Sequence, residues 1–321
     1  MPSALLAILA SLSLGSGPGL RERSLDVINT HFHRAPGFKA HAAVPPYGVA
    51  NSSHAGRRHE QCAADGKVCP ACSPDWRYCP CRRFETTGKT YGCGLEWDDW
   101  VMVKALVTPA TVILEAGARF GTTSCTIAHA MGNSGMVVSV EPDASVIPAL
   151  LRNRDANHCN VHVFSGSVSA QRMFLNPHDY GSHTSKVPSE LYRSAAFEVP
   201  NVSYRQLEAA IGARFNAVLI DCEGCIETLP LPLLEQVDLI LIEEDGFRQV
   251  NYQKWHKWFK SQGFTRVWYA RDSVFPAATN DFRLLRHSAW QRGGRTEATP
   301  TCGAYAARER LPAGLLSCIA E

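Results

Sequence analysis

The sequence has no marked excess of charge of either sign, since 32 lysine and arginine residues are balanced by 30 aspartate and glutamate residues over 321 residues. Such a chain lacks the strong positive field with which proteins attract nucleic acid or anionic membrane surfaces. It also lacks an apolar run of the roughly 20 residues that cross a bilayer as a helix. We therefore expect no nucleic-acid partner and no stable membrane span, and we expect a small molecule or glycan as the ligand. The composition does not predict the oligomeric state.

What the sequence does contain is a run of apolar strands that end in acids. VILEAGARFG at 112 to 121 predicts a strand, a turn of small residues and the start of a helix. A second apolar strand, 136 to 140, is followed by Glu141. In open α/β sheets ligands bind at the carboxyl ends of the strands, where an acid can accept hydrogen bonds from both hydroxyls of a ribose. The pattern predicts a nucleoside-shaped pocket beside Gly117, which has no Cβ to obstruct a ligand.

The glycine turn lacks the pattern of a dinucleotide site. Binding of a pyrophosphate requires Gly-x-Gly-x-x-Gly, whereas this chain has Gly117-x-x-x-Gly121, with Arg119 in place of the middle glycine. NAD and FAD are therefore disfavoured. S-adenosylmethionine has no phosphate, so an acid for its ribose and a turn of small residues for its amino-acid part would suffice.

Two further strands complete the alternation of strands and helices. FNAVLIDCEG at 215 to 224 ends in Asp221, Glu223 and Gly224, and VDLILIEEDG at 237 to 246 again ends in acids. Such alternation predicts an α/β fold with a mostly parallel sheet and helices on both of its faces.

Together these motifs resemble the FkbM family of S-adenosylmethionine-dependent methyltransferases, whose fourth strand ends in Ile-Asp-x-Glu-Gly, here 220 to 224. The resemblance covers about 97 to 287 and implies a class I methyltransferase-like (Rossmann-like) fold that closes with an antiparallel pair, at 267 to 270 and 282 to 286. It implies S-adenosyl-L-methionine as donor and a hydroxyl oxygen as the methylated atom. Asp221 and Glu223 would be catalytic, and the donor would be bound by Glu115, Gly117, Ala118, Gly121, Glu141 and Asp221. The chain departs from the family at Arg119, where glycine is common, and at Glu115, where aspartate is more usual.

Two other functions are open on these residues: a nucleotide-dependent oxidoreductase, which Arg119 disfavours, and a noncatalytic secreted binding protein on a methyltransferase scaffold. No metal site is predicted. A divalent cation held by Asp221, Glu243 and Asp245 is possible but not favoured, and Glu244 and Asp245 are expected to be solvated.

Cysteine is abundant, with 12 residues, and Cys62, Cys69, Cys72, Cys79, Cys81 and Cys93 are close together in the sequence. Such density in a loop-rich stretch is typical of disulfides in an oxidising compartment, and the Cys79-x-Cys81 spacing disfavours zinc. An apolar leader at 1 to 20 and the sequons at Asn51 and Asn201 agree with the secretory pathway. Cys222 and Cys225 are interpreted as buried thiols rather than a redox pair, and Cys125 and His129 as packing or surface residues.

The chain divides into a signal peptide at 1 to 20, a poorly ordered stem at 21 to 61, a disulfide module at 62 to 94, a methyltransferase-like domain at 95 to 290 and a tail at 291 to 321, where Cys302 and Cys318 could pair. The stretch 165 to 203 shows no periodicity. It is either a solvated loop or a lid over the ligand that contributes His178, Tyr180 and His183. Trp255 and Trp258 are expected in the core.

Overall fold

The computed structural model describes residues 26–37, 85, 96–177, 182–188, 195–244, 250–271 and 285–293. The leader, nearly all of the cysteine-rich module and the tail after 293 lie outside these residues. So do several residues that the sequence singled out: Asn51, His178, Tyr180, Asp245, Cys302 and Cys318. Among the described residues, no helix has the length and apolar character needed to cross a bilayer.

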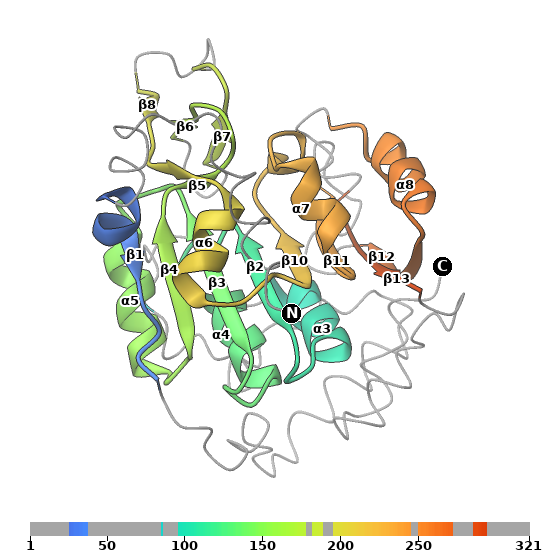
Figure 1. Cartoon of the computed structure of the whole chain (residues 1–321), viewed down its shortest axis with the longest axis horizontal. Coiled ribbons are helices and arrows are strands. Elements are labelled where there is room, and N and C mark those ends of the chain that lie inside the picture. Colours follow the sequence, from blue (N-terminus) through green and yellow to red (C-terminus); the bar gives the residue numbers. More distant parts are fainter. Residues whose placement is uncertain are drawn as a thin grey trace, which may run out of the picture.

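An eight-stranded sheet forms the centre of the molecule (Figure 1). Its five parallel strands lie in the order β4 (Val161–Ser165), β3 (Met136–Glu141), β2 (Val112–Ala116), β10 (Ala217–Ile220) and β11 (Leu239–Glu244). The chain runs outward from β2 to β4 and then returns to β10 beside β2. Ligands bind at this kind of reversal in open α/β sheets.

The far edge of the sheet is antiparallel, as the family resemblance implied. β13 (Arg286–Arg292) lies between β11 and β12 (Phe264–Arg271) and is antiparallel to both. Of the strand expected at 282 to 286, residues 282 to 284 lie outside the described residues, and the observed strand begins at Arg286. The sequence from Arg286 looks too polar for an inner strand, but His287 and Ser288 are buried there with hydrogen-bond partners on α3 and β11.

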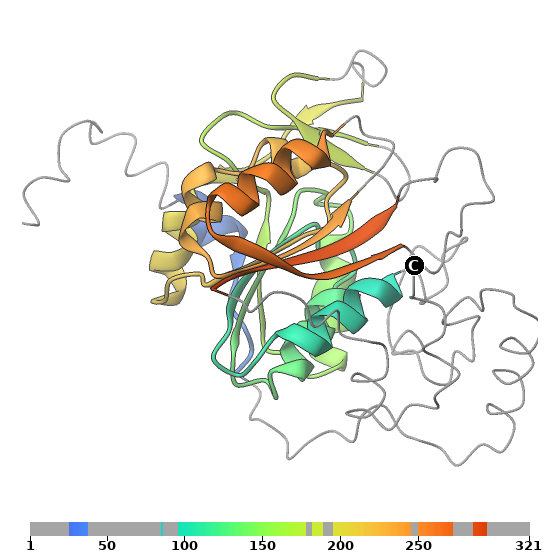
Figure 2. The same cartoon turned by 90° about the vertical axis from the view of Figure 1, so that its right-hand side faces the viewer.

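Helices cover both faces of the sheet, as predicted (Figure 2). Strand side chains alternate between two cores, so that Ile113 packs with one and Leu114 with the other. The first core is completed by α3 (Trp97–Leu106), α4 (Thr122–Ala130) and α5 (Ile147–Ala156). The second is completed by α6 (Tyr204–Ile211), α7 (Leu231–Gln236) and α8 (Tyr252–Ser261), and it contains Trp255, with Trp258 packed against it.

The stem predicted at 21 to 61 contains an ordered segment. β1 (Phe32–His33) pairs antiparallel with β4, and Phe32 packs against the second core. The Ala35 amide donates to His162 Nδ1 over 3.1 Å. The prediction of disorder was therefore wrong for residues 26–37, which complete one edge of the sheet.

The stretch 165 to 203 contains short strands rather than only irregular loop. β5 (Ser167–Val168) pairs with β9 (Asn201–Val202), and β6 (Phe174–Asn176) lies between β7 (His183–Ser185) and β8 (Phe197–Glu198). Their two- to three-residue lengths are too short for a period-2 pattern to be recognised in the sequence. They form a small structure above the carboxyl ends of the parallel strands (Figure 1).

The prediction that Cys222 and Cys225 are thiols was wrong, whereas the prediction that Cys125 is a packing residue is confirmed, because Cys125 is buried in the first core. Cys125 forms a disulfide with Cys159, and Cys222 forms one with Cys225, so none of the four is a free thiol. The first bond joins α4 to the segment that enters β4, and the second spans the turn after β10.

Candidate functional site

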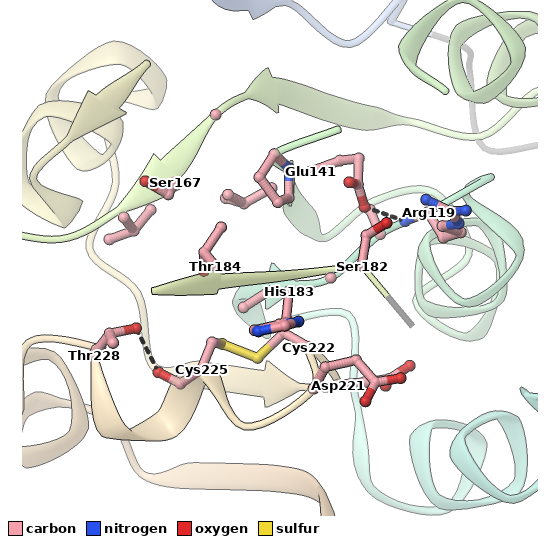
Figure 3. Close-up of a pocket in the computed structure, with 18 of the residues that line it drawn as sticks. Arg119, Glu141, Ser167, Ser182, His183, Thr184, Asp221, Cys222, Cys225 and Thr228 are labelled. Atoms are coloured by element: carbon pink, nitrogen blue, oxygen red, sulfur yellow. Dashed lines mark hydrogen bonds between the residues drawn. A yellow bond between two sulfur atoms is a disulfide. The ribbon is translucent and has the colours of Figure 1, made fainter. Parts of the chain in front are cut away.

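A pocket lies at the carboxyl ends of β2, β3 and β10, beneath the small strands of the insertion (Figure 3). The space between its lining residues, with the open mouth included, is about 870 Å³. Six residues from the predicted motifs line it: Gly117, Ala118, Arg119, Glu141, Asp221 and Glu223. The structure thus brings together acids that are far apart in the sequence.

The Gly117 turn supports the floor of this pocket. Gly117 has φ +95°, and a Cβ there would overlap the carbonyl oxygen of Asp221 and lie 2.7 Å from its carbonyl carbon. The turn is therefore packed directly on the end of β10. Only glycine allows both this conformation and this approach.

The amide groups of the turn are already used within the protein. Gly117 N and Ala118 N donate to Val140 O over 3.0 and 3.2 Å, and Gly121 N donates to Ala118 O over 2.7 Å. Arg119 N donates to Glu141 Oε2 over 2.8 Å. A pyrophosphate is normally bound by free amides at this position, so the turn is poorly suited to a dinucleotide.

Two backbone amides hold the carboxylate of Glu141 at the edge of the pocket. Besides the bond from Arg119 N, Glu141 Oε1 accepts the Asp143 amide over 2.7 Å. Among the described residues no other group donates to this carboxylate, although each carboxylate oxygen can accept two hydrogen bonds. One lone pair on each oxygen is thus available to a ligand with two adjacent hydroxyls.

Arg119 adopts a left-handed backbone, with φ 44°, at the position where a dinucleotide motif has glycine. Its guanidinium donates to Asp143 Oδ2 over 3.0 Å. The backbone amide of Arg119 thus binds Glu141, while its side chain binds Asp143. Arg119 therefore brings a cation close to Glu141.

Glu115 and Gly121 do not line the pocket. Glu115 is fully buried behind the turn, where its Oε2 accepts hydrogen bonds from Ser124 and Ser139. Gly121 is the N-cap residue of α4, with φ 81°, and it packs against Leu150. Their predicted contact with a donor has no support from this geometry; both instead hold the glycine turn and α4 in place.

Burial raises the pKa of both Glu115 and Glu141 to about 7. A carboxyl whose pKa is higher in the folded than in the unfolded protein stabilises the fold at low pH, and this stabilisation is lost as the pH rises to the folded pKa. A rise of the pKa of Glu115 from 4.5 to about 7 corresponds to a loss of folding free energy on the order of 3 kcal/mol for this one group.

We expect the free energy of unfolding in urea to fall between pH 5 and pH 8, and to fall by about 2–3 kcal/mol less in Glu115→Gln. The control is Glu235→Gln, which replaces an exposed carboxylate and should retain the wild-type pH dependence. An equal fall in Glu115→Gln and the wild type would contradict the prediction.

Asp221 and Glu223 lie on the turn after β10. Glu223 has φ 57° and Gly224 has φ 89°, and consecutive left-handed residues of this kind are found where a functional site fixes the backbone. The disulfide between Cys222 and Cys225 closes the same turn and also lines the pocket (Figure 3). The turn that carries both acids is therefore covalently constrained.

The insertion covers the pocket from the opposite side. Met173, Ser182, His183 and Thr184 all line it, and Figure 3 shows the His183 ring beside the Cys222–Cys225 disulfide. The prediction that His183 faces the ligand is supported by this position.

Of the acids predicted as a possible metal set, Asp245 lies outside the described residues, and among those residues Glu243 does not join Asp221 in a group of three that could hold a metal ion. Glu244, expected to be solvated, is buried, and its Oε1 accepts a hydrogen bond from Ser288 over 2.6 Å and lies 2.7 Å from His256 Nε2. Asp221 instead lies with Glu96 and Asp99, and one carboxylate oxygen from each lies within 4.8 Å of the other two. Sequence reasoning missed Glu96 and Asp99; the signal was the acidic start, EWDD, of an otherwise apolar helix.

Neither a protein-family model nor a curated protein matches the chain. Solved structures that align with it include the precorrin-6y C5,15-methyltransferase from Geobacter metallireducens, at 10% identity and a TM-score of 0.40, over 66% of this chain and 94% of that chain. An O-methyltransferase from Bacillus cereus in complex with SAH aligns at 11% identity and a TM-score of 0.39, over 76% and 93%. The fibrillarin pre-rRNA processing protein of Methanococcus jannaschii aligns at 12% identity and a TM-score of 0.41, over 66% and 88%. Because these scores are low, the function is argued below from the geometry of this chain alone.

Proposed function

We propose that this protein is an S-adenosylmethionine-dependent methyltransferase that acts on a hydroxyl oxygen of a small molecule or glycan. The observation that carries the proposal is Glu141, whose two oxygens are fixed by the amides of Arg119 and Asp143 and each retain a lone pair for a ribose hydroxyl. Membership of the FkbM family is part of the proposal.

The residues of the pocket fit this donor better than a dinucleotide. Glu141 would bind the ribose, and the turn at Gly117 and Ala118, which both line the pocket, would lie under the amino-acid part. The amides of this turn are occupied, which does not affect a ligand without phosphate. The surrounding acids also suit a donor that carries a positive sulfonium.

When bound, the donor supplies a methyl group on a positively charged sulfur. In the transfer the carbon–sulfur bond breaks, its electron pair stays on sulfur, and a carbon–oxygen bond forms to the acceptor. The acceptor hydroxyl gives up its proton, and Asp221 at the end of β10 is the proposed base, with Glu223 as the second candidate. Positioning in a pocket covered by the insertion supplies most of the remaining acceleration.

We place the protein in the secretory pathway. The two disulfides among the described residues support this, since such bonds persist mainly in oxidising compartments.

Isothermal titration of the full chain tests the donor. We expect S-adenosylmethionine to bind about a hundredfold more tightly than NAD, a difference of about 3 kcal/mol, because the turn offers the pyrophosphate no amides. Tighter binding of NAD would favour an oxidoreductase. Donor binding without transfer of a radiolabelled methyl group in a broad acceptor screen would favour a noncatalytic binding protein.

A further inference from the structure

Three acids meet where the amino end of α3 packs against the end of β10. Glu96 is the N-cap residue of α3, Asp99 lies in the first turn of that helix, and Asp221 follows β10. One carboxylate oxygen from each lies within 4.8 Å of the other two. Oxygen ligands of one cation have this spacing, because each lies about 2.0–2.6 Å from the ion.

A second observation comes from Asp99 itself. Its side chain is 1% exposed, and Oδ2 accepts no hydrogen bond from any described residue. Asp99 Oδ1 lies 3.1 Å from His287 Nδ1, so half of the carboxylate is held in place while the other half has no partner. A buried carboxylate oxygen in this state costs free energy unless a cation or donor reaches it.

The favourable position of acids at a helix N-terminus does not by itself account for the three clustered carboxylates of Glu96, Asp99 and Asp221. Acids in the first turn of a helix are favoured by the helix dipole, but that effect operates at exposed positions and does not require burial of Asp99 beside two other carboxylates. Repulsion between three acids at this distance would oppose folding of the turn. A positive ligand among them removes both costs.

We propose that Glu96, Asp99 and Asp221 bind a hard divalent cation. An organic ammonium group fits less well, because Asp99 is not among the residues that line the pocket, and a compact ion can reach its buried oxygen. The ion also neutralises two of the three negative charges, where an ammonium neutralises one. Carboxylate oxygens are the ligands preferred by Mg²⁺ and Ca²⁺.

The cation would face the pocket on one side. Glu96 and Asp221 both line it, so the coordination positions not taken by the protein open toward the space where the acceptor is expected. If the proposed function holds, the ion would bind and polarise the acceptor oxygen. Asp221 would then be a ligand of the ion, and Glu223, the second candidate for the base, would take the acceptor proton. Binding of the ion does not depend on the methyl donor, so the two proposals can fail separately.

The test is titration of the full chain with Mn²⁺, with binding measured by electron paramagnetic resonance. Calorimetric titrations with Mg²⁺ and with Ca²⁺ then distinguish the two physiological ions. We expect one site per chain, with binding at least tenfold weaker in Glu96→Gln and in Asp99→Asn. The control Asp155→Asn removes an exposed carboxylate on α5 and should bind Mn²⁺ like the wild type.

Melting in chelator shows whether the variants fold. Without a cation, Asp99→Asn should melt no lower than the wild type, because the substitution removes a buried charge with one unsatisfied oxygen. Added Mn²⁺ should raise the melting temperature of the wild type and of Asp155→Asn, but not of Glu96→Gln or Asp99→Asn. Absence of Mn²⁺ binding at millimolar concentration, or equal binding in wild type and both variants, would overturn the site. Titration of S-adenosylmethionine in chelator tests the proposed function separately.

Discussion

Replacing Glu141 by alanine is expected to weaken binding of S-adenosylmethionine by about a hundredfold or more. The variant loses two hydrogen bonds from ribose hydroxyls to a carboxylate, each worth about 1.5–3 kcal/mol, and every 1.4 kcal/mol corresponds to about a factor of ten in the dissociation constant. It also loses the acceptor that holds the amides of Arg119 and Asp143. Calorimetric titration of the donor at a pH above 7, where Glu141 is ionised, measures the effect.

Two further variants show whether the weaker binding comes from the lost ribose contacts or from disruption of the pocket as a whole. Glu141→Gln keeps one acceptor oxygen without the charge and should bind with intermediate affinity. Glu223→Gln changes an acid of the same pocket that is assigned to the acceptor side, so the donor should bind within about threefold of wild type, a difference of less than 1 kcal/mol. If Glu141→Ala bound the donor with wild-type affinity, Glu141 would not bind the ribose, and the methyltransferase proposal would lose its main support.

Replacing Gly117 by alanine should have the largest effect on both folding and donor binding. The new Cβ would overlap the Asp221 carbonyl group and lie 3.0 Å from Cys222 Cα, so the turn and the end of β10 must separate. Left-handed strain and overpacking together should lower the free energy of unfolding by about 3 kcal/mol or more. Urea unfolding and donor titration measure the two effects, and we expect no detectable binding.

The matched control is Gly132→Ala. Gly132 also has a left-handed backbone, with φ +62°, but a Cβ there would meet nothing within 4 Å. This variant isolates the conformational cost, about 1 kcal/mol, and should bind the donor normally. If both variants lost the same stability and retained binding, the contact between the glycine turn and β10 would have no functional importance.

The sequence predicted the parts of the fold that depend on local pattern. Apolar runs located four of the five parallel strands, β2, β3, β10 and β11, and Glu141 was recognised because an acid comes at the end of an apolar strand. The antiparallel edge was expected only from the family resemblance. Most of β13 was not predicted, because His287 and Ser288 read as surface residues, whereas Asp99 and Glu244 satisfy them in the interior.

Contacts between distant segments could not be predicted in this way. Glu96 and Asp99 approach Asp221 only because α3 packs on the sheet, and no periodicity in the sequence encodes that packing. The bond from Cys125 to Cys159 spans 34 residues and likewise depends on where α4 lies. Glu115 illustrates the opposite error: the family resemblance implied a ligand contact, but its buried side chain accepts hydrogen bonds from Ser124 and Ser139.

The cross-link between Cys222 and Cys225 bears on how this protein must be prepared. It ties together the turn that presents Asp221 and Glu223. Material made in a reducing cytosol, or stored with a thiol reductant, would have these two acids on an untethered segment. A measurement on such material would report on the reduced turn, so assays belong in thiol-free solution, on protein whose disulfides have been verified by mass spectrometry.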